Sequence, residues 1–321
     1  MIKIFGQTDT LFSTNGDKIL QPTKCKIHKQ DNGEYYADIE CSPDYSDYIK
    51  NGRIVVCPTP TGDQAFRFLN PELNKTKIKV KAKHVYYDSE NYLIQDSYVV
   101  DKNCNQALEH LNAATDNESP FTTVSDVTSI NSFRCVRKSL NEAVNTVLER
   151  WGGHLVRDNF NIAIRSSIGA DNGVTIRYGK NLKEIKKTED WNNVITKILP
   201  VGKDGLLLDE VYLYSDTQYA LPYTKTVSFT QEIEQEEGET DDAYTFRLKE
   251  DLRQQATAYL AENCVPKINY TVKADIEKIT DIGDTIDVID EGLGISLTTH
   301  VIAFEYDAIL EKFTQVEFGN S

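Results

Sequence analysis

Histidine is the side chain best suited to acid–base or metal chemistry near neutral pH, and the chain has five. They are His28, His84, His110, His154 and His300. None lies in a His-x-x-x-His or His-Glu-x-x-His spacing, so the sequence contains no recognisable ligand set of a zinc hydrolase. His84 and His300 lie in expected strands, where a hydrogen-bonded structural histidine is the favoured interpretation. A nucleophilic Cys–His pair remains an alternative, because such partners are brought together by the fold and need not be close in sequence.

The six cysteines show no metal-binding spacing either. They are Cys25, Cys41, Cys57, Cys104, Cys135 and Cys264. No two of them form a Cys-x-x-Cys motif, and their intervals match no zinc module. We therefore favour reduced, mostly buried thiols over a disulfide framework. The Gly-x-Ser-x-Gly motif, the phosphate-binding Gly-rich loop and the dinucleotide fingerprint are also absent.

Carboxylates are plentiful, with 50 Asp and Glu residues, so chance pairs in space are certain. A glycosidase needs one carboxylic acid of raised pKa and one ionised partner in a cleft, which the sequence does not identify. One acidic loop, which contains Asp284, Asp287, Asp290 and Glu291, is a candidate calcium site. Its spacing does not match the EF-hand pattern, so a solvated acidic loop is favoured.

Lysine is concentrated in one place, where it alternates with other residues. Lys77, Lys79, Lys81 and Lys83 fall on one side of an expected strand, and Ile78, Val80, Ala82 and His84 fall on the other. This strict alternation predicts a half-buried strand. The lysine side is a candidate docking surface for an acidic partner, but a solvent-facing strand or a protected sheet edge is favoured.

The sequence thus assigns no catalytic residue, no cofactor-binding residue and no metal ligand, and we expect no cofactor. A chain of 321 residues suggests about two domains. Its formal net charge of −15 disfavours non-specific binding to nucleic acid and to anionic membranes. No apolar stretch is long enough for a transmembrane helix or a signal peptide, so we expect no membrane anchor and synthesis in a cytoplasm.

Residues 1–97 read as short strands joined by turns, which predicts a first β-barrel-like domain. The segments 24–30 and 34–41 flank the turn signal Asp31-Asn32-Gly33 and predict a hairpin. A three-residue turn pairs odd positions with odd ones and keeps the apolar residues together. We therefore predict that Cys25 and Cys41 lie on one face of adjacent antiparallel strands, near one another and reduced.

Residues 98–190 predict an α+β domain. Residues 103–114 are a modest helix candidate. Ser139-Leu-Asn-Glu142 is a capping box that opens a stronger helix, which Gly152-Gly153 ends. Hairpin and strand patterns follow the second helix.

Residues 191–230 and 266–321 return to strands and predict a second β-barrel-like domain. Residues 231–265 predict an acidic loop followed by a helical insertion with Thr240 as its N-cap. Tyr244, Leu248, Leu252, Ala256 and Leu260 recur every fourth position and would pack that helix on the later barrel. The expected fold class is therefore mainly β with α+β parts.

Several segments together resemble a known family. They are Tyr178-Gly-Lys-Asn-Leu-Lys-Glu-Ile, residues 193–205, Pro266-Lys-Ile-Asn-Tyr-Thr-Val, Ile282-Gly-Asp-Thr-Ile-Asp-Val followed by Asp290-Glu-Gly-Leu-Gly, and Val316-Glu-Phe-Gly-Asn. In this order and spacing they resemble the N-terminal baseplate-hub region of phage and prophage minor tail proteins. That family is called the prophage endopeptidase tail, or tail-associated lysin, family.

The resemblance implies a baseplate hub with two β-barrel-like domains and smaller domains between and within them. It also implies a homotrimeric ring below the tail tube that contacts a distal tail ring protein and the tape measure protein in the virion. DNA would pass through the ring without specific binding. A lytic domain often follows the hub region in this family, but this sequence stops at Ser321, one residue past the last motif, so we expect no enzymatic activity.

Two other functions remain as alternatives. The first is a tail-associated cell-wall hydrolase, either a peptidase or a glycosidase, with a site assembled from scattered carboxylates or a Cys–His pair. The second is a carbohydrate-binding receptor protein, which rests only on the 17 Tyr and 2 Trp residues. Tyrosine-rich strands are ordinary in β proteins, which weakens the second alternative.

Overall fold

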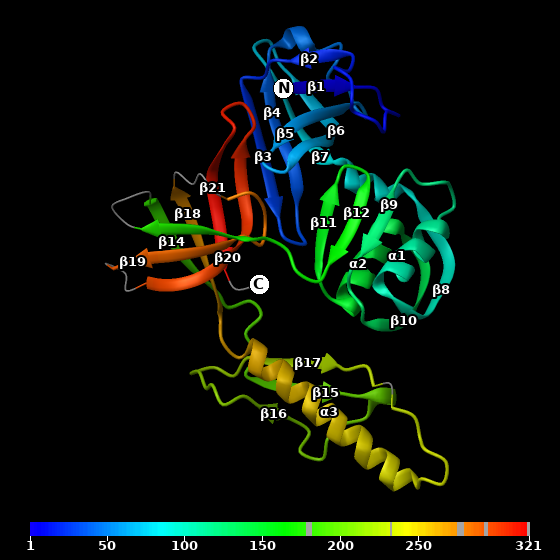
Figure 1. Ribbon diagram of the computed structural model, residues 1–321. Coiled ribbons are helices and arrows are strands. Elements are labelled where there is room, and N and C mark those ends of the chain that lie inside the picture. Colours follow the sequence, from blue (N-terminus) through cyan, green and yellow to red (C-terminus); the bar gives the residue numbers. More distant parts are fainter. Residues whose placement is uncertain (178–181, 232, 275–278, 292–294, 320–321) are drawn as a thin grey trace. The chain divides into compact units, whose positions relative to one another are not determined.

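The computed structural model describes residues 1–177, 182–231, 233–274, 279–291 and 295–319. These residues are mainly β, with three α-helices and four sheets (Figure 1). They form two compact units: unit 1 contains residues 1–186 and 270–319, and unit 2 contains residues 187–269. The expectation of a mainly β chain with α+β parts is confirmed.

The N-terminal segment of unit 1 is built from seven strands. They are β1 (Ile2–Phe5), β2 (Lys18–Leu20), β3 (Lys24–Gln30), β4 (Tyr35–Cys41), β5 (Ile54–Thr59), β6 (Gly62–Leu73) and β7 (Ile78–His84). Short 3-10 helices follow β4 at Pro43–Tyr45 and β7 at Val85–Asn91. Burial alternates along β3, β4 and β7, because successive side chains of a strand point to opposite faces.

The β3–β4 hairpin has the predicted register. Cys25 pairs with Ile39 and Ile27 with Ala37, so odd positions face odd ones across the three-residue turn 31–33. Asn32 adopts a left-handed φ of 48°, which Asn tolerates better than most residues. Cys25 and Cys41 are both buried and free on one face of the hairpin, as expected.

The sheet of this segment is strongly curled. In strand order β3 and β5 are separated by β4, β7 and β6, so a flat sheet would place them about 19 Å apart. Yet the Sγ atoms of Cys25 on β3 and Cys57 on β5 lie only 3.7 Å apart in the core. The two strands therefore face each other across the interior.

The middle segment of unit 1 packs two helices against short sheets. Its elements are β8 (Leu93–Asn103), α1 (Cys104–Ala113), β9 (Thr122–Ser125), β10 (Ile130–Ser139), α2 (Leu140–Trp151), β11 (His154–Asp158) and β12 (Asn161–Arg165). The predicted capping box of Ser139 and Glu142 opens α2, and Asn103 with Gln106 forms a second one at α1. Leu108, Leu111, Val144 and Val147 are fully buried in the core that both helices share.

Six later strands, two of which run across the boundary between the units, extend the same large sheet. They are β13 (Asp171–Arg177), β14 (Leu182–Asp190), β18 (Lys267–Ala274), β19 (Thr285–Asp290), β20 (Ile295–Asp307) and β21 (Lys312–Gly319). The strand order is β14-β18-β21-β20-β3-β4-β7-β6-β5-β1-β2, with β19 paired to β20 and β13 to β19. The antiparallel β20–β3 pair places Phe304 opposite Lys29 and Tyr306 opposite Ile27. The N-terminal and C-terminal strands thus share one sheet, and no sheet of the described residues closes on itself.

The β3–β4 turn joins three parts of unit 1. Asp31 donates its backbone N–H to Ile302 of β20 and accepts a 3.0 Å contact from His154 of β11. The side chain of Asn32 accepts a hydrogen bond from the backbone of Leu155. Arg157, which is 3% exposed, donates to the carbonyl oxygens of Gly33 and Gln30. Hydrogen bonds to β11 and to β20 therefore hold this turn in place.

Unit 2 is a three-stranded sheet with one helix. Its elements are β15 (Lys197–Val201), the 3-10 helix Lys203–Gly205, β16 (Leu213–Tyr214), β17 (Thr224–Ser228) and α3 (Asp241–Asn263), which lies on the sheet (Figure 1). Thr240 caps α3 as predicted, and Leu248, Leu252, Ala256 and Leu260 are buried. Tyr244, expected in the same stripe, is only half-buried and bonds through its hydroxyl to the carbonyl of Ile233.

The two compact units group the chain differently from the expected domains. Residues 191–230, assigned from the sequence to the second barrel with 266–321, lie in unit 2 together with the expected insertion 231–265. The boundaries near residues 97 and 190 stay a prediction. None of the helices in the described residues combines the length and apolarity of a membrane-spanning helix.

Candidate functional site

The lysine stripe lies on the outer side of β7. Lys79, Lys81 and Lys83 are exposed, whereas the residues between them are buried. β7 pairs with β4 on one side and with β6 on the other. It is an interior strand, so the interpretation of a protected sheet edge is wrong, whereas the interpretation of a solvent-facing strand agrees with the exposure.

Carboxylates of β4 face these lysines across the sheet. Lys81 pairs with Asp38 and Lys79 with Glu40 in the strand register. Glu40 accepts a 2.6 Å hydrogen bond from Lys77 and lies 3.7 Å from Lys79. The hydrogen bond from Lys77 holds the pKa of Glu40 below its ordinary value. The stripe is therefore partly neutralised by the neighbouring strand.

The alternation of charge continues onto the next two strands. β3 presents Lys24 and Lys26 outward; Lys24 lies 4.0 Å from Asp38, and Lys26 lies 3.1 Å from Glu305 of β20. We call the outward residues of β20, β3, β4 and β7 the charged face. Its members are Glu305, Asp307, Lys24, Lys26, His28, Tyr36, Asp38, Glu40, Lys79, Lys81 and Lys83. Opposite charges on neighbouring strands support the register of this sheet.

His28 lies at the centre of the charged face. Its Nε2 atom is 3.6 Å from a carboxylate oxygen of both Asp38 and Glu305, and its ring stacks on Tyr36 at 4.6 Å. Burial lowers the pKa of His28, although both carboxylates act in the opposite direction. The ammonium group of Lys81 lies 3.5 Å from the centre of the Tyr36 ring, a close cation–π contact.

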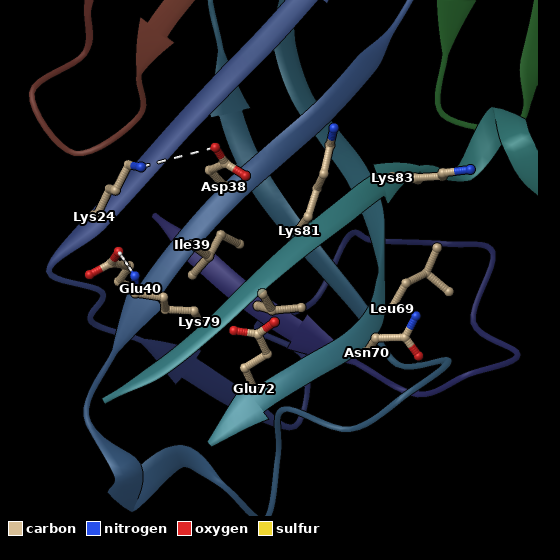
Figure 2. Close-up of a pocket in the computed structure, with 11 residues that line it drawn as sticks. Lys24, Asp38, Ile39, Glu40, Leu69, Asn70, Glu72, Lys79, Lys81 and Lys83 are labelled. Carbon is tan, nitrogen blue, oxygen red and sulfur yellow. Dashed lines mark ion pairs between the residues drawn. The ribbon is translucent and has the colours of Figure 1, made fainter. Parts of the chain in front are cut away.

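An open hollow of about 620 Å³ lies on the charged face toward β6. Four lysines line it (Lys24, Lys79, Lys81 and Lys83), against three carboxylates (Asp38, Glu40 and Glu72). Figure 2 shows these side chains on β3, β4, β7 and β6, with ion pairs from Lys24 to Asp38 and from Lys79 to Glu40. Such a lining favours contact with a polar, charged partner over an apolar small molecule.

Three carboxylates of the charged face, Glu40, Glu305 and Asp307, lack the property of a general acid. Such an acid needs a raised pKa, but the pKa values of Glu40, Glu305 and Asp307 are lowered. Burial alone would raise the last two, but hydrogen bonds outweigh it. Thr314 and Lys26 donate to Glu305, and the backbone N–H groups of Leu310 and Ile309 donate to Asp307.

The other histidines lie apart from one another. His84 is fully buried, stacks on Tyr35 at 4.4 Å and lies 3.0 Å from the amide oxygen of Gln64, so it is a structural histidine as favoured. His110 contacts Ser97 at 2.9 Å. His154 contacts Asp31. Ser97 and Asp31 thus contact two different histidines, whereas in a Ser–His–Asp triad one histidine contacts both. The hydrogen bonds of Cys25, Cys57 and Cys264 go to partners other than histidine.

The acidic loop has a structural role at Asp284. This carboxylate is 1% exposed and accepts hydrogen bonds from the backbone of Ala170 and from Thr280. Asp287 accepts one from Thr298. Among the described residues, no group of three or more His, Cys, Asp or Glu side chains is placed to hold a metal ion. The calcium interpretation therefore finds no support at this loop.

Arg157 and the β3–β4 turn are the residues that sequence reasoning did not single out. Arg157 occupies an alternating strand pattern in which an arginine is normally exposed, so no local signal marks its burial. Asp31-Asn32-Gly33 signals a turn, but nothing in it shows that its polar groups bind β11 and β20. These contacts link residues more than 120 positions apart.

The sequence profile of the prophage endopeptidase tail family matches residues 170–321. Within the resemblance motifs, residues 178–181, 292–294 and 320 lie outside the described residues. No curated protein matches the sequence.

Solved structures show the same fold over the whole chain. Prophage tail protein gp18 from Listeria monocytogenes matches 100% of this chain and 94% of its own, with a TM-score of 0.66 and 16% identity. The tail protein from Neisseria meningitidis matches 100% and 96%, with a TM-score of 0.67 and 12% identity. The E. coli c3393 protein, a type VI secretion component described as similar to T4 tail proteins gp27 and gp5, matches 99% and 76%, with a TM-score of 0.54 and 8% identity. The chain thus has the fold of prophage tail proteins, and its residues 170–321 match the model of the prophage endopeptidase tail family.

Proposed function

We propose that this chain is a structural hub protein of a phage or prophage tail tip. In this proposal three copies form a ring below the tail tube, help to close or open the DNA conduit, and anchor the distal tail ring protein and the tape measure protein. The family match and the shared fold support a structural part in a tail.

The observation that carries the proposal is the β20–β3 pairing. It joins the N-terminal and the C-terminal strands of one chain into a single sheet, so each subunit offers two β segments side by side. Three subunits would then present six similar segments, which suits a junction between a three-fold hub and a six-fold tail ring. Cyclic symmetry is the usual way for one chain to enclose an axis.

The barrel-like form of each β segment belongs to the same proposal. The contact of Cys25 with Cys57 supports it for the N-terminal segment, because the curl brings β3 and β5 face to face. We keep the boundaries 1–97 and 98–190 as a proposal for the first barrel-like and the α+β domains.

Charge supports a passive conduit. A subunit of net charge −15 repels phosphate, so a trimer would let DNA slide rather than bind it. On the charged face, each row of lysines faces a row of carboxylates. We propose that this face contacts another tip protein through complementary charges, since electrostatic complementarity fixes partner and orientation.

The proposal includes the absence of enzymatic activity. The downward-shifted carboxylate pKa values of Glu40, Glu305 and Asp307 support it. We expect no release of peptide or sugar when the purified chain is incubated with cell walls. Release that disappears on substituting one acidic residue or cysteine would replace the hub by the alternative, a cell-wall hydrolase.

The deciding experiment is imaging of the intact particle, with this chain located by a fused tag. We expect three copies on the tail axis below the tube. Any other copy number, or a position away from the axis, contradicts the hub. A monomer in dilute solution does not, because the tail supplies a template that solution lacks.

A further inference from the structure

Five of the six cysteines are buried, and two of these are in direct contact. Cys25 on β3 and Cys57 on β5 are both 0% exposed, with their Sγ atoms 3.7 Å apart. They belong to the core that also contains Ile27, Phe66 and Phe68. None of the structural roles described above requires two thiols to touch there, since a valine or an alanine fills such a position equally well.

We propose that Cys25 and Cys57 form a redox-sensitive pair that closes to a disulfide when the chain leaves a reducing cytoplasm. Closure requires the sulfur atoms to approach from 3.7 Å to about 2 Å. The bond would join two strands that share no backbone hydrogen bonds and that three strands separate in the sheet order.

The reaction balances with a small-molecule disulfide such as oxidised glutathione. One protein thiolate attacks a glutathione sulfur, forms a mixed disulfide and releases one reduced glutathione. The second protein thiolate attacks the protein sulfur of that mixed disulfide, forms the Cys25–Cys57 bond and releases the second glutathione. The two protons of the protein thiols end on the two released glutathione molecules.

Burial makes this reaction slow. The contact with Cys25, together with burial, raises the pKa of the Cys57 thiol well above its ordinary value. The thiolate is the attacking species, so oxidation waits for a local opening of the first β segment. The pair therefore stays reduced during synthesis in a cytoplasm and closes gradually outside it, or quickly during refolding in an oxidising buffer.

The bridge would act on the part of the chain that carries the β3–β4 turn. A bond between residues 25 and 57 restricts the unfolded chain and stabilises the folded one. It would hold β3, whose turn binds β11 and β20, against the opposite side of its own core. The inference rests on the proposed function in one respect only, since the virion location determines where the chain meets an oxidant.

The test uses the full chain with Cys264→Ser, because Cys264 is the one cysteine that is not buried. The protein is refolded in a mixture of oxidised and reduced glutathione, quenched with acid and treated with a thiol-blocking reagent. We expect two of the five remaining thiols to escape blocking and a peptide map to link Cys25 to Cys57. Adding Cys25→Ser or Cys57→Ser should abolish the link. Cys41→Ser, a buried cysteine of the same core, should leave it intact.

Two results overturn the inference. The first is a refolded chain with native circular dichroism whose five thiols all react with the blocking reagent after denaturation. The second is a bridged chain that unfolds at a lower temperature than its reduced form, since the bridge should raise the midpoint reversibly with dithiothreitol. Both readouts are independent of copy number in the particle, so they separate this inference from the hub proposal.

Discussion

Lys29 of β3 and Asp281, in the turn before β19, form an ion pair of 2.7 Å that ties the N-terminal strands of unit 1 to the C-terminal ones. The ammonium group donates to both carboxylate oxygens, and the Lys29 side chain is only 7% exposed. The same ammonium group lies 5.3 Å from the centre of the Tyr35 ring. The pair spans 252 positions of sequence and lies beside the β20–β3 junction.

We predict that Lys29→Met lowers the free energy of unfolding of unit 1 by about 1–3 kcal/mol, because a hydrogen-bonded charge pair of low exposure is lost. Denaturant unfolding of Lys29→Met, Asp281→Asn and the double variant measures their coupling. The matched control is Lys75→Met, which removes an exposed lysine of the β6–β7 turn and should change stability by less than about 0.5 kcal/mol. If the changes in unfolding free energy of the two single variants sum to that of the double variant, Lys29 and Asp281 are not coupled.

We predict that Leu252→Ala destabilises unit 2 by about 2–5 kcal/mol, because Leu252 is fully buried between α3 and its sheet. Phe246→Ala is the control on the same helix, because Phe246 is 65% exposed. Calorimetric unfolding of the parent chain and of both variants measures the midpoint of the unit 2 transition. An unchanged midpoint for Leu252→Ala would mean that the buried stripe does not stabilise the unit.

We expect the buried His84 to make the free energy of unfolding depend on pH. Its burial, followed by the charges of Arg157 and Lys29, lowers its pKa well below the ordinary 6.5. The folded protein then binds fewer protons than the unfolded chain, so this contribution is full above about pH 6.5 and is lost as the pH falls toward the lowered pKa.

We therefore expect His84→Gln to flatten the loss of unfolding free energy between about pH 7 and pH 5, where His84 contributes up to about 1.4 kcal/mol per pH unit. The glutamine amide can still donate to Gln64 and accept from the backbone of Tyr86, as His84 does. His28→Gln is the comparison, and it should flatten the profile less because His28 is half-buried. An equal slope in the parent and His84→Gln contradicts the assignment.

We expect charge reversal on the charged face to impair assembly into particles without preventing folding. Lys81→Glu with Lys83→Glu reverses two exposed lysines of the hollow, which should lower incorporation into particles at least several-fold, and a native circular dichroism spectrum of the variant checks that it still folds. Incorporation is measured by quantitative blotting of purified particles. Lys75→Glu, exposed in the β6–β7 turn, is the control. Normal incorporation of the double variant would remove the charged face from the contacts of the hub.

Local elements of this protein are determined by the sequence alone. Alternation from Cys25 to Cys41 determined the hairpin register, and the Ser139–Glu142 capping box located the start of α2. Thr240 and the four-residue spacing of Leu248, Leu252 and Leu260 located α3. These signals are local because capping and side-chain periodicity act within a few residues of the backbone. The motifs in residues 178–320 also identified the family, whose profile matches 170–321.

Only the tertiary structure decided which distant strands meet. The β20–β3 pair, the Lys29–Asp281 contact and the burial of Arg157 each join segments more than 120 residues apart. A strand pattern specifies which face is buried but not which neighbour it pairs with, and many pairings satisfy the same alternation. The choice follows from the packing of whole faces into one core. The lysine stripe therefore lies on an interior strand opposite carboxylates, and not on a sheet edge, which was one of the two structural interpretations that the sequence left open.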